Sequence, residues 1–498
     1  MSDAARVNKF DGQRNAVISV SNKSGLENVA KFLISNGYKL FATTGTMNYI
    51  NGHGSECSSV DELTGGNEML GGRVKTLSRE LMAGILAKRR EDEELKNAGI
   101  TPIDLVYVEP YDFLGNFLAG ENDMTEFIDI GGITLLRAAA KNFQRVIPVL
   151  GVTEMNLVMK EMKNGDVPVA LRKELASFIF EFTSMYDYAI SQWLGDGGRI
   201  FSLGGSEFVK LRYGENPHQM ARSFNLYRPF FEMLREGKEI SFNNIIDAWT
   251  AWELVTRLGN GAASIVKHAS PCGAATGHES IEKAFESDPV SAYGGILAYN
   301  SILTEADAKF LKNKFLEVVI AGGYSPDAFK ILDQKKNLRI LKGNYEIYSV
   351  PDIRTAGNVI LEQEWNRKSD LKIEERAGRT NEEIKADIVF GWEVVKSIKS
   401  NSIAIVRDGW MISSCGGQPN RVDSVKIAIE RAKGRISDRA VLISDGFFPF
   451  VDSLQYIHEN GIKIVAAPMG SIRDEEVIEY AKGSGLVFVE VKERAFRH

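Results

Sequence analysis

Two side chains that often carry out catalysis, Lys267 and His268, stand next to each other in the segment "ASIVKHASPCG" (263–273). The apolar run "ASIV" predicts a buried strand, and Ser270–Gly273 predicts the turn that ends it. The lysine and histidine then fall at a strand end, where functional residues are common. In a regular strand they would point to opposite faces, so their use on one substrate requires a bulge or turn. A surface lysine beside a half-buried histidine is the alternative interpretation.

Two turns near the amino terminus carry groups that suit a phosphate. In "SVSNKSGL" (19–26) a strand runs into a turn and a helix follows at once, and "ATTGT" (42–46) repeats this order after the next strand. Backbone N–H groups, hydroxyls and an ammonium converge in such loops. Ser and Thr also serve as ordinary helix caps, but two loops at successive strand ends favour a phosphorylated ligand. The candidate residues are Ser21, Lys23, Ser24 and Gly25 in the first loop and Thr44, Gly45 and Thr46 in the second.

Charged residues beside glycine pairs form two further candidate clusters. The segment "GGRVKTL" (71–77) contains Arg73, Lys75 and Thr76. In "IDIGGITLLRAAAKN" (128–142), Asp129 precedes a Gly-Gly turn and Lys141 ends the helix expected to follow. The alternatives are a solvated turn, a capping role for Asp129 and a favourable helix-dipole position for Lys141.

Two segments of the carboxyl-terminal part suit ligand contacts. In "LRYGENPHQ" (211–219), Arg212 and Tyr213 lie among glycine, proline and other polar residues, a mixture that forms no helix or strand face and predicts a polar partner. In "SDGFFPF" (444–450), Phe447 and Pro449 lie in a turn context, where aromatic faces can stack on a flat ligand. Burial of these phenylalanines in the core is the alternative.

The elements that position the amino-terminal candidates alternate between strands and helices. From "NAVISV" (15–20) onward, strands, glycine turns and helices follow in a βαβ rhythm, which predicts a parallel sheet. Further strands are expected within 103–111 and 145–152, and helices at 134–143 and 171–194. Residues 1–200 are therefore predicted to form one α/β domain.

The rest of the chain, residues 201–498, is predicted to form a second domain that is internally doubled. "AASIVKHASPCGAATG" (262–277) and "SNSIAIVRDGWMISSCGGQPNR" (400–421) each give an apolar strand, a polar turn and a Cys-Gly element. A helix is expected after each of them, at 280–287 and 424–434. This weak repeat predicts two α/β subdomains that share a cleft.

Composition narrows the function classes. A chain of 498 residues with 44% hydrophobic residues needs two or more cores. Its net charge of -6, without a basic block, argues against nucleic acid or a membrane surface as partner. Its three distant cysteines fit reduced thiols, and neither they nor the six histidines have zinc-site spacing, so no metal site is expected. Without a secretory signal or a spanning apolar run, a cytoplasmic protein is expected.

The motifs together resemble a known family, the bifunctional enzymes of purine nucleotide synthesis that join AICAR transformylase to IMP cyclohydrolase. The similarity runs in the same order from "SVSNKSG" near residue 20 to "AFRH" at the carboxyl terminus. It also includes "SFNNIIDAWTAWELV", "DPVSAYGGILA", "SNSIAIVRDG" and "GSIRDEEVI". The resemblance implies an α/β fold with a methylglyoxal-synthase-like domain over 1–200 and two cytidine-deaminase-like α/β subdomains without zinc over 201–498. It further implies a homodimer with the transformylase site at the interface.

For the second domain the resemblance implies formyl transfer from the cosubstrate 10-formyltetrahydrofolate to the 5-amino group of AICAR. This amine is a poor nucleophile, so it needs a base, and the formyl oxygen needs a positive partner. His268 can accept the proton, Lys267 can supply the charge, and Asn401 hydrogen bonds near the formyl group. The implied substrate contacts are Arg212, Tyr213, Asn244, Phe447, Pro449 and Arg494. A monovalent cation near Asp445 is considered, and no transition metal is implied.

For the first domain the resemblance implies closure of formyl-AICAR to IMP. Lys75, Tyr111, Asp129 and Lys141 match the catalytic positions, and Arg73 and Thr76 join the two phosphate loops in binding substrate. The chain departs from the family pattern after "KTL", where Ser78 and Met82 stand at positions at which histidines are common. The carboxylates of Glu109 and Asp112 are also additions, and they should weaken binding of an anionic nucleotide unless Arg73 or a lysine offsets them.

Three hypotheses about function follow. The leading one is a bifunctional enzyme that makes IMP from AICAR. The second keeps only the transformylase, with a degenerate first domain, and the third is a non-catalytic regulator that binds a purine nucleotide or folate. Retention of Lys267, His268 and Asn401 argues against the third, because a binding protein needs no base beside an amine.

Overall fold

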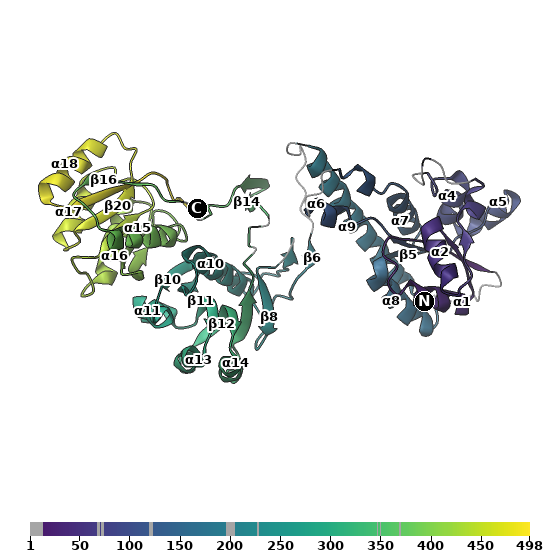
Figure 1. Ribbon diagram of the computed structural model, residues 1–498, viewed down its shortest axis with the longest axis horizontal. Coiled ribbons are helices and arrows are strands. Elements are labelled where there is room, and N and C mark those ends of the chain that lie inside the picture. Colours follow the sequence, from purple (N-terminus) through teal and green to yellow (C-terminus); the bar gives the residue numbers. More distant parts are fainter. Residues whose placement is uncertain are drawn as a thin grey trace. The chain divides into compact units, whose positions relative to one another are not determined.

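The structure is a computed structural model that describes residues 13–66, 70, 74–118, 123–195, 205–226, 229–345, 347–348, 350–367 and 370–498. The chain divides into two compact units, residues 1–204 and 205–498 (Figure 1). Within the described ranges, no helix combines the length and the apolar character that crossing a membrane requires.

Unit 1 is built on a five-stranded parallel sheet with the order β3-β2-β1-β4-β5. Its strands are β1 (Arg14–Val20), β2 (Tyr38–Ala42), β3 (Ser58–Ser59), β4 (Leu105–Glu109) and β5 (Ile147–Leu150). Alternate side chains of β1 enter different cores, Ala16 and Ile18 on one face and Val17 on the other. The predicted βαβ order with parallel strands is confirmed.

Helices cover both faces of this sheet. They are α1 (Leu26–Ser35), α2 (Thr44–Gly52), α3 (Asp61–Thr64), α4 (Arg79–Leu86), α5 (Asp92–Asn97), α6 (Phe113–Leu118), α7 (Gly131–Lys141), α8 (Gly151–Lys163) and α9 (Val169–Leu194). Residues of α1 and α8 pack on one face, and residues of α4 and α7 pack on the other. The helices expected at 134–143 and 171–194 correspond to α7 and α9.

Unit 2 contains a twelve-stranded mixed sheet with the order β16-β21-β20-β19-β17-β18-β10-β9-β11-β12-β13-β8. The strands of its first half are β8 (Phe231–Arg235), β9 (Ala263–Lys267), β10 (Ser270–Ala275), β11 (Gly295–Leu303), β12 (Leu316–Tyr324) and β13 (Arg339–Gly343). Those of its second half are β16 (Ile373–Ala377), β17 (Ile403–Arg407), β18 (Trp410–Cys415), β19 (Val441–Ser444), β20 (Ile464–Pro468) and β21 (Val487–Val491).

The two halves of this sheet repeat one another. Outward from the central antiparallel pair of β10 and β18, β9 matches β17, β11 matches β19, β12 matches β20 and β13 matches β21. The helices are α10 (Phe242–Leu258), α11 (Ser280–Ser287), α12 (Pro289–Ala292), α13 (Glu305–Leu311) and α14 (Pro326–Asp333), then α15 (Glu382–Val395), α16 (Arg421–Ala432), α17 (Asp452–Glu459) and α18 (Asp474–Ser484). Two small hairpins, β6 (Ser206–Glu207) with β7 (Phe224–Asn225) and β14 (Asp352–Ala356) with β15 (Val359–Gln363), complete the unit. The predicted internal doubling is confirmed.

Strand directions bring the candidate residues of unit 2 to one end of the sheet, which we call the Lys267 end. Strands β9 and β18 run one way and β10 and β17 the other, so β9 ends where β17 begins. Strands β19, β20 and β21 also end there, because β19 is antiparallel to β17 and parallel to β20. Three strand spacings separate β9 from β17, which is about 14 Å.

The turn predicted at Ser270–Gly273 is wrong. These residues begin β10, and the turn consists of His268 and Ala269, flanked by the paired residues Lys267 and Ser270. Pro271 is tolerated in the strand because the register shifts between Pro271 and Gly273, where a bulge relieves the pairing. Cys272 and Cys415 lie in strands β10 and β18.

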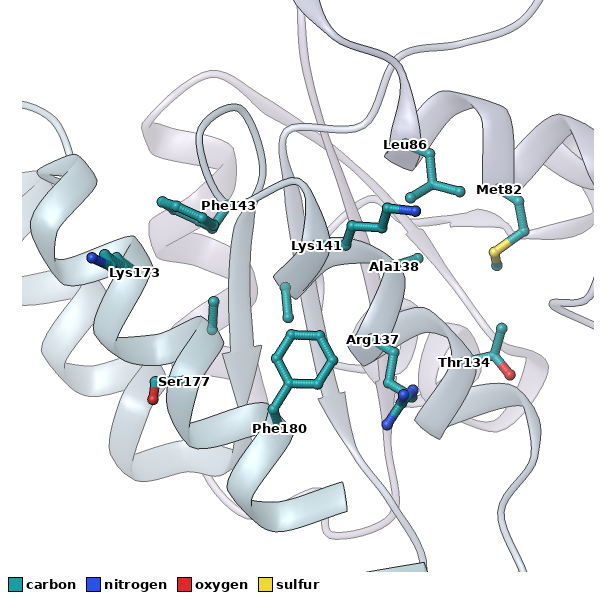
Figure 2. Close-up of a pocket in the computed structure, with 12 residues that line it drawn as sticks. Met82, Leu86, Thr134, Arg137, Ala138, Lys141, Phe143, Lys173, Ser177 and Phe180 are labelled. Carbon is teal, nitrogen blue, oxygen red and sulfur yellow. The ribbon is translucent and has the colours of Figure 1, made fainter. Parts of the chain in front are cut away.

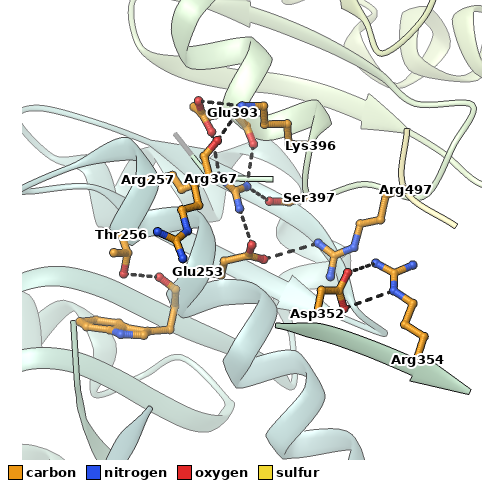
Figure 3. A network of polar contacts seen from close by, with 11 residues as sticks. Glu253, Thr256, Arg257, Asp352, Arg354, Arg367, Glu393, Lys396, Ser397 and Arg497 are labelled. Carbon is orange, nitrogen blue, oxygen red and sulfur yellow. Dashed lines mark hydrogen bonds and ion pairs between the residues drawn. The ribbon is translucent and has the colours of Figure 1, made fainter. Parts of the chain in front are cut away.

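A buried ionic network joins the two halves of unit 2 (Figure 3). The Arg257 guanidinium on α10 lies 2.7 Å from Glu253 of the same helix and 2.8 Å from Glu393 on α15. It also donates to the Ser397 hydroxyl at 2.6 Å. Lys396 pairs with Glu393, and Arg497 of the carboxyl-terminal segment reaches Glu253. The network therefore connects α10, α15 and the chain end.

Replacement of Arg257 by Met should lower the free energy of unfolding of unit 2 by about 3–5 kcal/mol, because two buried carboxylates lose their main partner. Chemical denaturation of the full chain, followed by tryptophan fluorescence, measures this loss. Lys309→Ala serves as the control, since it breaks the exposed pair with Glu305 and should change the free energy by less than about 0.5 kcal/mol. Equal effects of the two variants would contradict the stabilising role of the network.

Candidate active sites

The two predicted phosphate loops of unit 1 meet at the carboxyl ends of β1 and β2. Gly25 caps α1 with φ of 77°, a left-handed conformation that favours glycine. The Lys23 ammonium donates to the Val20 carbonyl at 2.5 Å and lies 3.4 Å from the hydroxyl of buried Thr46. Thr44 and Gly45 form the start of α2, whose N–H groups and dipole favour an anion. The structure thus brings the two loops together as expected.

A second cluster lies beside these loops and contains three of the predicted catalytic residues. Burial raises the pKa of Asp129, while the Gly132 N–H, the Lys75 ammonium and the Tyr111 backbone act in the opposite direction. The Gly132 N–H donates to the Asp129 carboxylate at 2.7 Å. Burial also lowers the pKa of Lys23, and the nearby charge of Lys75 lowers it further. Lys75 therefore lies within electrostatic reach of both Asp129 and the first phosphate loop.

Thr76 also belongs to this cluster, whereas Arg73 lies outside the described residues. Thr76 is buried, and a Cβ added at Gly131 would come within 2.5 Å of its hydroxyl oxygen. Glycine at 131 thus allows helix α7 to start against Thr76, next to Asp129.

The departures from the family pattern have structural explanations in unit 1. Ser78 caps α4 by accepting from the Leu81 N–H at 3.1 Å, and Met82 packs against the core. Asp112 accepts from the Gly115 N–H at 2.8 Å, so this added carboxylate is engaged at the start of α6. Burial raises the pKa of Glu109 and the Lys23 charge lowers it, which identifies Lys23 as the lysine that offsets the other added carboxylate.

Lys141 is not brought together with Asp129. It ends α7, ten residues after Gly131, so about 15 Å of helix axis separates it from the start of that helix. Figure 2 shows Lys141 in a groove with Met82, Arg137 and Phe180. The groove has a volume of about 690 Å³. The catalytic role that the resemblance implies for Lys141 stays a prediction.

In unit 2, Lys267 and His268 sit where β9 turns into β10. The Lys267 ammonium donates to the Tyr293 carbonyl at 2.8 Å, and the His268 side chain is exposed. His268 and Ala269 have φ of 55° and 54°, a left-handed conformation that costs a non-glycine residue about 1–2 kcal/mol. Both N–H groups donate to the Asp247 carboxylate, at 3.1 and 2.6 Å. Lys267 and His268 are therefore joined through a turn, and their shared use on one substrate stays a prediction.

The predicted nucleotide contacts of the first half also lie at the Lys267 end. The Arg212 guanidinium lies 4.4 Å from the centre of the Tyr213 ring. Asn244 is buried and donates to Glu317 at 2.8 Å. Burial lowers the pKa of Arg339, Glu317 opposes this shift and Arg212 reinforces it, which places Arg212 near that ion pair.

The second half contributes Asn401 to the same end of the sheet. Its side-chain oxygen accepts from Arg421 at 2.8 Å, and its NH₂ group donates to the Gln418 carbonyl at 2.9 Å. Arg421 also pairs with fully buried Asp445. The other Asp445 oxygen accepts from the Ser400 hydroxyl at 2.6 Å.

The aromatic segment after β19 contains the remaining predicted site residues of unit 2 at the Lys267 end. Phe448 is buried in the core, whereas Phe447 and Pro449 are half-buried, and their contact with a flat ligand stays a prediction. The Arg494 guanidinium lies 5.3 Å from the centre of the Phe447 ring. These residues follow strands that end at the Lys267 end.

Sequence reasoning missed Asp247, Glu317 and Arg421 as partners of the predicted residues. Asp247 and Glu317 lie in an amphipathic helix and a buried strand, and their local patterns give no sign of a site. Arg421 could have been predicted, because it is the last residue of the repeat segment 400–421, which also contains Asn401. Among the described residues, no three His, Cys, Asp or Glu side chains form a group that could hold a metal ion.

These observations define a two-unit α/β protein with a phosphate-type site in a parallel sheet and a lysine-histidine site in a doubled sheet. Comparison with known proteins matches two family models to this chain. The family described as "AICARFT/IMPCHase bienzyme" matches residues 139–431, more than half of the chain, and the "MGS-like domain" matches residues 25–134. The chain belongs to the AICARFT/IMPCHase bienzyme family, with an MGS-like domain near its amino terminus.

Curated relatives match over nearly the full length. The "Bifunctional purine biosynthesis protein PurH" of Clostridium acetobutylicum is 39% identical, with 97% of this chain and 100% of the relative covered. The protein of the same name from Fusobacterium nucleatum is 38% identical, with 98% and 100% covered. A solved structure titled "Crystal structure of ForH" is 34% identical and covers 37% of this chain and 100% of its own, with a TM-score of 0.32, too low to support an argument about fold.

Replacement of Ala269 by Gly should raise the free energy of unfolding of unit 2 by about 1 kcal/mol, because glycine adopts a positive φ without strain. Chemical denaturation of the full chain measures the gain. The matched control is Gly409→Ala in the corresponding turn of the second half, where φ is 66° and a Cβ would lie 2.5 Å from the Thr276 hydroxyl. The free energy of unfolding of this control should fall by at least about 1 kcal/mol. A fall with Ala269→Gly would contradict the claim that Ala269 is strained.

Proposed function

We propose that this protein is the enzyme of the last two steps of IMP synthesis, with cyclohydrolase activity in residues 1–200 and transformylase activity in residues 201–498. The 39% identity to bifunctional purine biosynthesis proteins over 97% of the chain carries this proposal. The geometry supports it, because each unit groups most of its predicted residues at one end of its sheet. The proposed substrates are AICAR, formyl-AICAR and the formyl donor 10-formyltetrahydrofolate, with IMP as product.

In the proposed transfer, the 5-amino nitrogen of AICAR attacks the formyl carbon of 10-formyltetrahydrofolate. His268 accepts the proton that the amine loses, and the Lys267 ammonium stabilises the negative charge that develops on the formyl oxygen. The bond from the carbon to N10 then breaks, and N10 takes up a proton. Asn401, fixed by Arg421 and the Gln418 carbonyl, orients the formyl group.

The proposed contacts to AICAR come from both halves of unit 2. Arg212 and Tyr213 form one planar cationic and aromatic pair, and Arg494 with Phe447 forms another. Asn244 is held rigidly by its capping role and by Glu317. These groups suit a ligand with a phosphate and a flat heterocycle.

We further propose a homodimer with the transformylase site at the interface. His268 is exposed, and about 14 Å of sheet separates β9 from β17, the strand that follows Asn401. A formyl group is small compared with that span, which favours a site to which two copies contribute. A second copy that supplies one of the two side chains would complete the site.

In the proposed ring closure, the carboxamide nitrogen of formyl-AICAR attacks the formyl carbon, and the resulting carbinol loses water to give IMP. The Lys75 ammonium stabilises the developing oxyanion. Burial raises the pKa of Asp129, which makes this carboxylate a better proton acceptor for the amide N–H. The loops around Lys23 and Thr46 hold the phosphate.

Further features of the proposal concern the fold of unit 2 and its surroundings. We assign its two halves to the cytidine-deaminase-like class without zinc, since each half has the same strand order. A cytoplasmic location fits an enzyme of small soluble substrates. A monovalent cation near Asp445 stays a prediction, and no step of the proposed reactions uses one.

The transformylase-only alternative would require a degenerate first unit. The grouping of Lys75, Asp129 and the phosphate loops speaks against degeneration, and Ser78 and Asp112 have local structural roles in this unit. Retained ring closure is therefore part of the proposal.

Two variants should separate the activities. His268→Ala should lower formyl transfer by about 10²–10⁴-fold, because the base is lost, and should still convert supplied formyl-AICAR to IMP at the wild-type rate. Lys75→Met should keep formyl transfer but lower ring closure by about 10²-fold or more, so that formyl-AICAR accumulates. Chromatographic separation of the purines measures both steps.

The matched controls are His278→Ala and Lys31→Met, which alter an exposed histidine of unit 2 and an exposed lysine of α1. Both should retain wild-type rates for the two steps. Unchanged formyl transfer by His268→Ala, or unchanged ring closure by Lys75→Met, would refute the corresponding assignment.

A further inference from the structure

The two halves of unit 2 contain equivalent hairpin turns of different composition. The turn between β9 and β10 is His268–Ala269, and the turn between β17 and β18 is Asp408–Gly409. All four residues have positive φ, between 54° and 66°. Two-residue hairpin turns of this kind favour Asp-Gly or Asn-Gly. The second half has the favoured pair, whereas the first half has a histidine and an alanine that strain the backbone.

An aspartate from the preceding helix holds each turn in the same way. The Asp247 carboxylate on α10 accepts from the His268 and Ala269 N–H groups at 3.1 and 2.6 Å. The Asp387 carboxylate on α15 accepts from the Asp408 and Gly409 N–H groups at 2.9 and 2.7 Å. Sequence separations of 21 and 22 residues occur in both halves. This contact between a helix carboxylate and both N–H groups of the turn is therefore part of the duplicated fold.

The same aspartate contact has different consequences in the two halves. Hydrogen bonds to a charged acceptor are stronger than those to a neutral one, and two of them offset the strain of two left-handed residues. In the second half little strain has to be offset, because Gly409 tolerates its φ. In the first half, the two bonds hold a strained residue that is also the proposed base. A rotation of His268 out of the left-handed conformation would break them.

Resting on the proposed function, we propose that Asp247 is a positioning residue for formyl transfer. By holding both N–H groups of the turn, its carboxylate fixes the direction in which the His268 imidazole leaves the backbone beside Lys267. It acts through the backbone and does not touch the substrate. Burial raises the pKa of Asp247, and its two N–H donors and His268 oppose this shift, which agrees with a carboxylate fully engaged by the turn.

Asp247→Asn in the full-length protein tests this role. Asn keeps one oxygen acceptor and loses the charge, so the turn should loosen without losing the fold. The kcat of formyl transfer should fall by about 10–100-fold, the range that a displacement of about 1 Å costs. The Kd of AICAR should change less than about twofold, and conversion of supplied formyl-AICAR to IMP should be unchanged. Amide hydrogen exchange at His268 and Ala269 should accelerate.

Asp387→Asn is the matched control, because it removes the equivalent charge from the turn at the opposite end of the sheet. It should accelerate exchange at Asp408 and Gly409 and leave the kcat of formyl transfer within about twofold of wild type. In the double variant Asp247→Asn with Ala269→Gly, the glycine removes part of the strain. At least a threefold recovery of kcat over Asp247→Asn alone is expected.

Several outcomes would overturn the inference. Wild-type kcat in Asp247→Asn would exclude a positioning role, and so would an equal loss in Asp387→Asn, which would indicate general destabilisation. Unchanged exchange at the His268 amide would show that the carboxylate does not hold the turn. Failure of the proposed function is distinguishable, because the wild-type protein would then show no formyl transfer at all.

Discussion

The buried guanidinium of Arg257 is the contact on which the arrangement of unit 2 depends. Its charge is shared by Glu253 on its own helix and Glu393 on α15, and Arg497 extends the network to the carboxyl-terminal segment. The Ser400 hydroxyl in turn accepts from the Arg497 N–H, which fixes that segment next to Asn401. Helix α10 carries Asn244 and Asp247, and the chain end carries Arg494. One desolvated charge cluster thus holds the helix and the chain end that carry two of the proposed substrate contacts, and its partners are costly to separate.

Duplication explains how the two halves come to share one end of the sheet. Because β10 and β18 are antiparallel, equivalent features of the halves lie at opposite ends, so the hairpin of the first half meets the helix-to-strand connection of the second. The first half supplies Lys267 and His268 from its hairpin, and the second supplies Asn401 from its connection. The proposed catalytic residues therefore come from different parts of one repeated unit. The Asp408–Gly409 turn shows what that hairpin contains where no base is required.

Much of this organisation could be predicted from the sequence, and the exceptions have physical causes. The apolar runs that form β1, β4 and β9 are short and are followed by turn residues, and the Cys-Gly repeat indicated the duplication. The turn was misplaced because Ser270–Pro271 has favoured turn chemistry and His268–Ala269 does not. What decides its position is the Asp247 carboxylate, 21 residues earlier, and a local pattern carries no such information. The family resemblance implied that Lys141 and Asp129 act at one site. Helix α7 separates them, because Asp129 precedes its start and Lys141 is its last residue.

The central claim is that one chain performs two successive reactions in separate units. Incubation of the purified protein with AICAR and 10-formyltetrahydrofolate, with the purines separated over time, tests it most directly. The account predicts that IMP appears without a lasting pool of formyl-AICAR and faster than formyl-AICAR closes in buffer alone. Persistent accumulation of formyl-AICAR would contradict the role assigned to unit 1, and the absence of any formylated product would contradict the account as a whole.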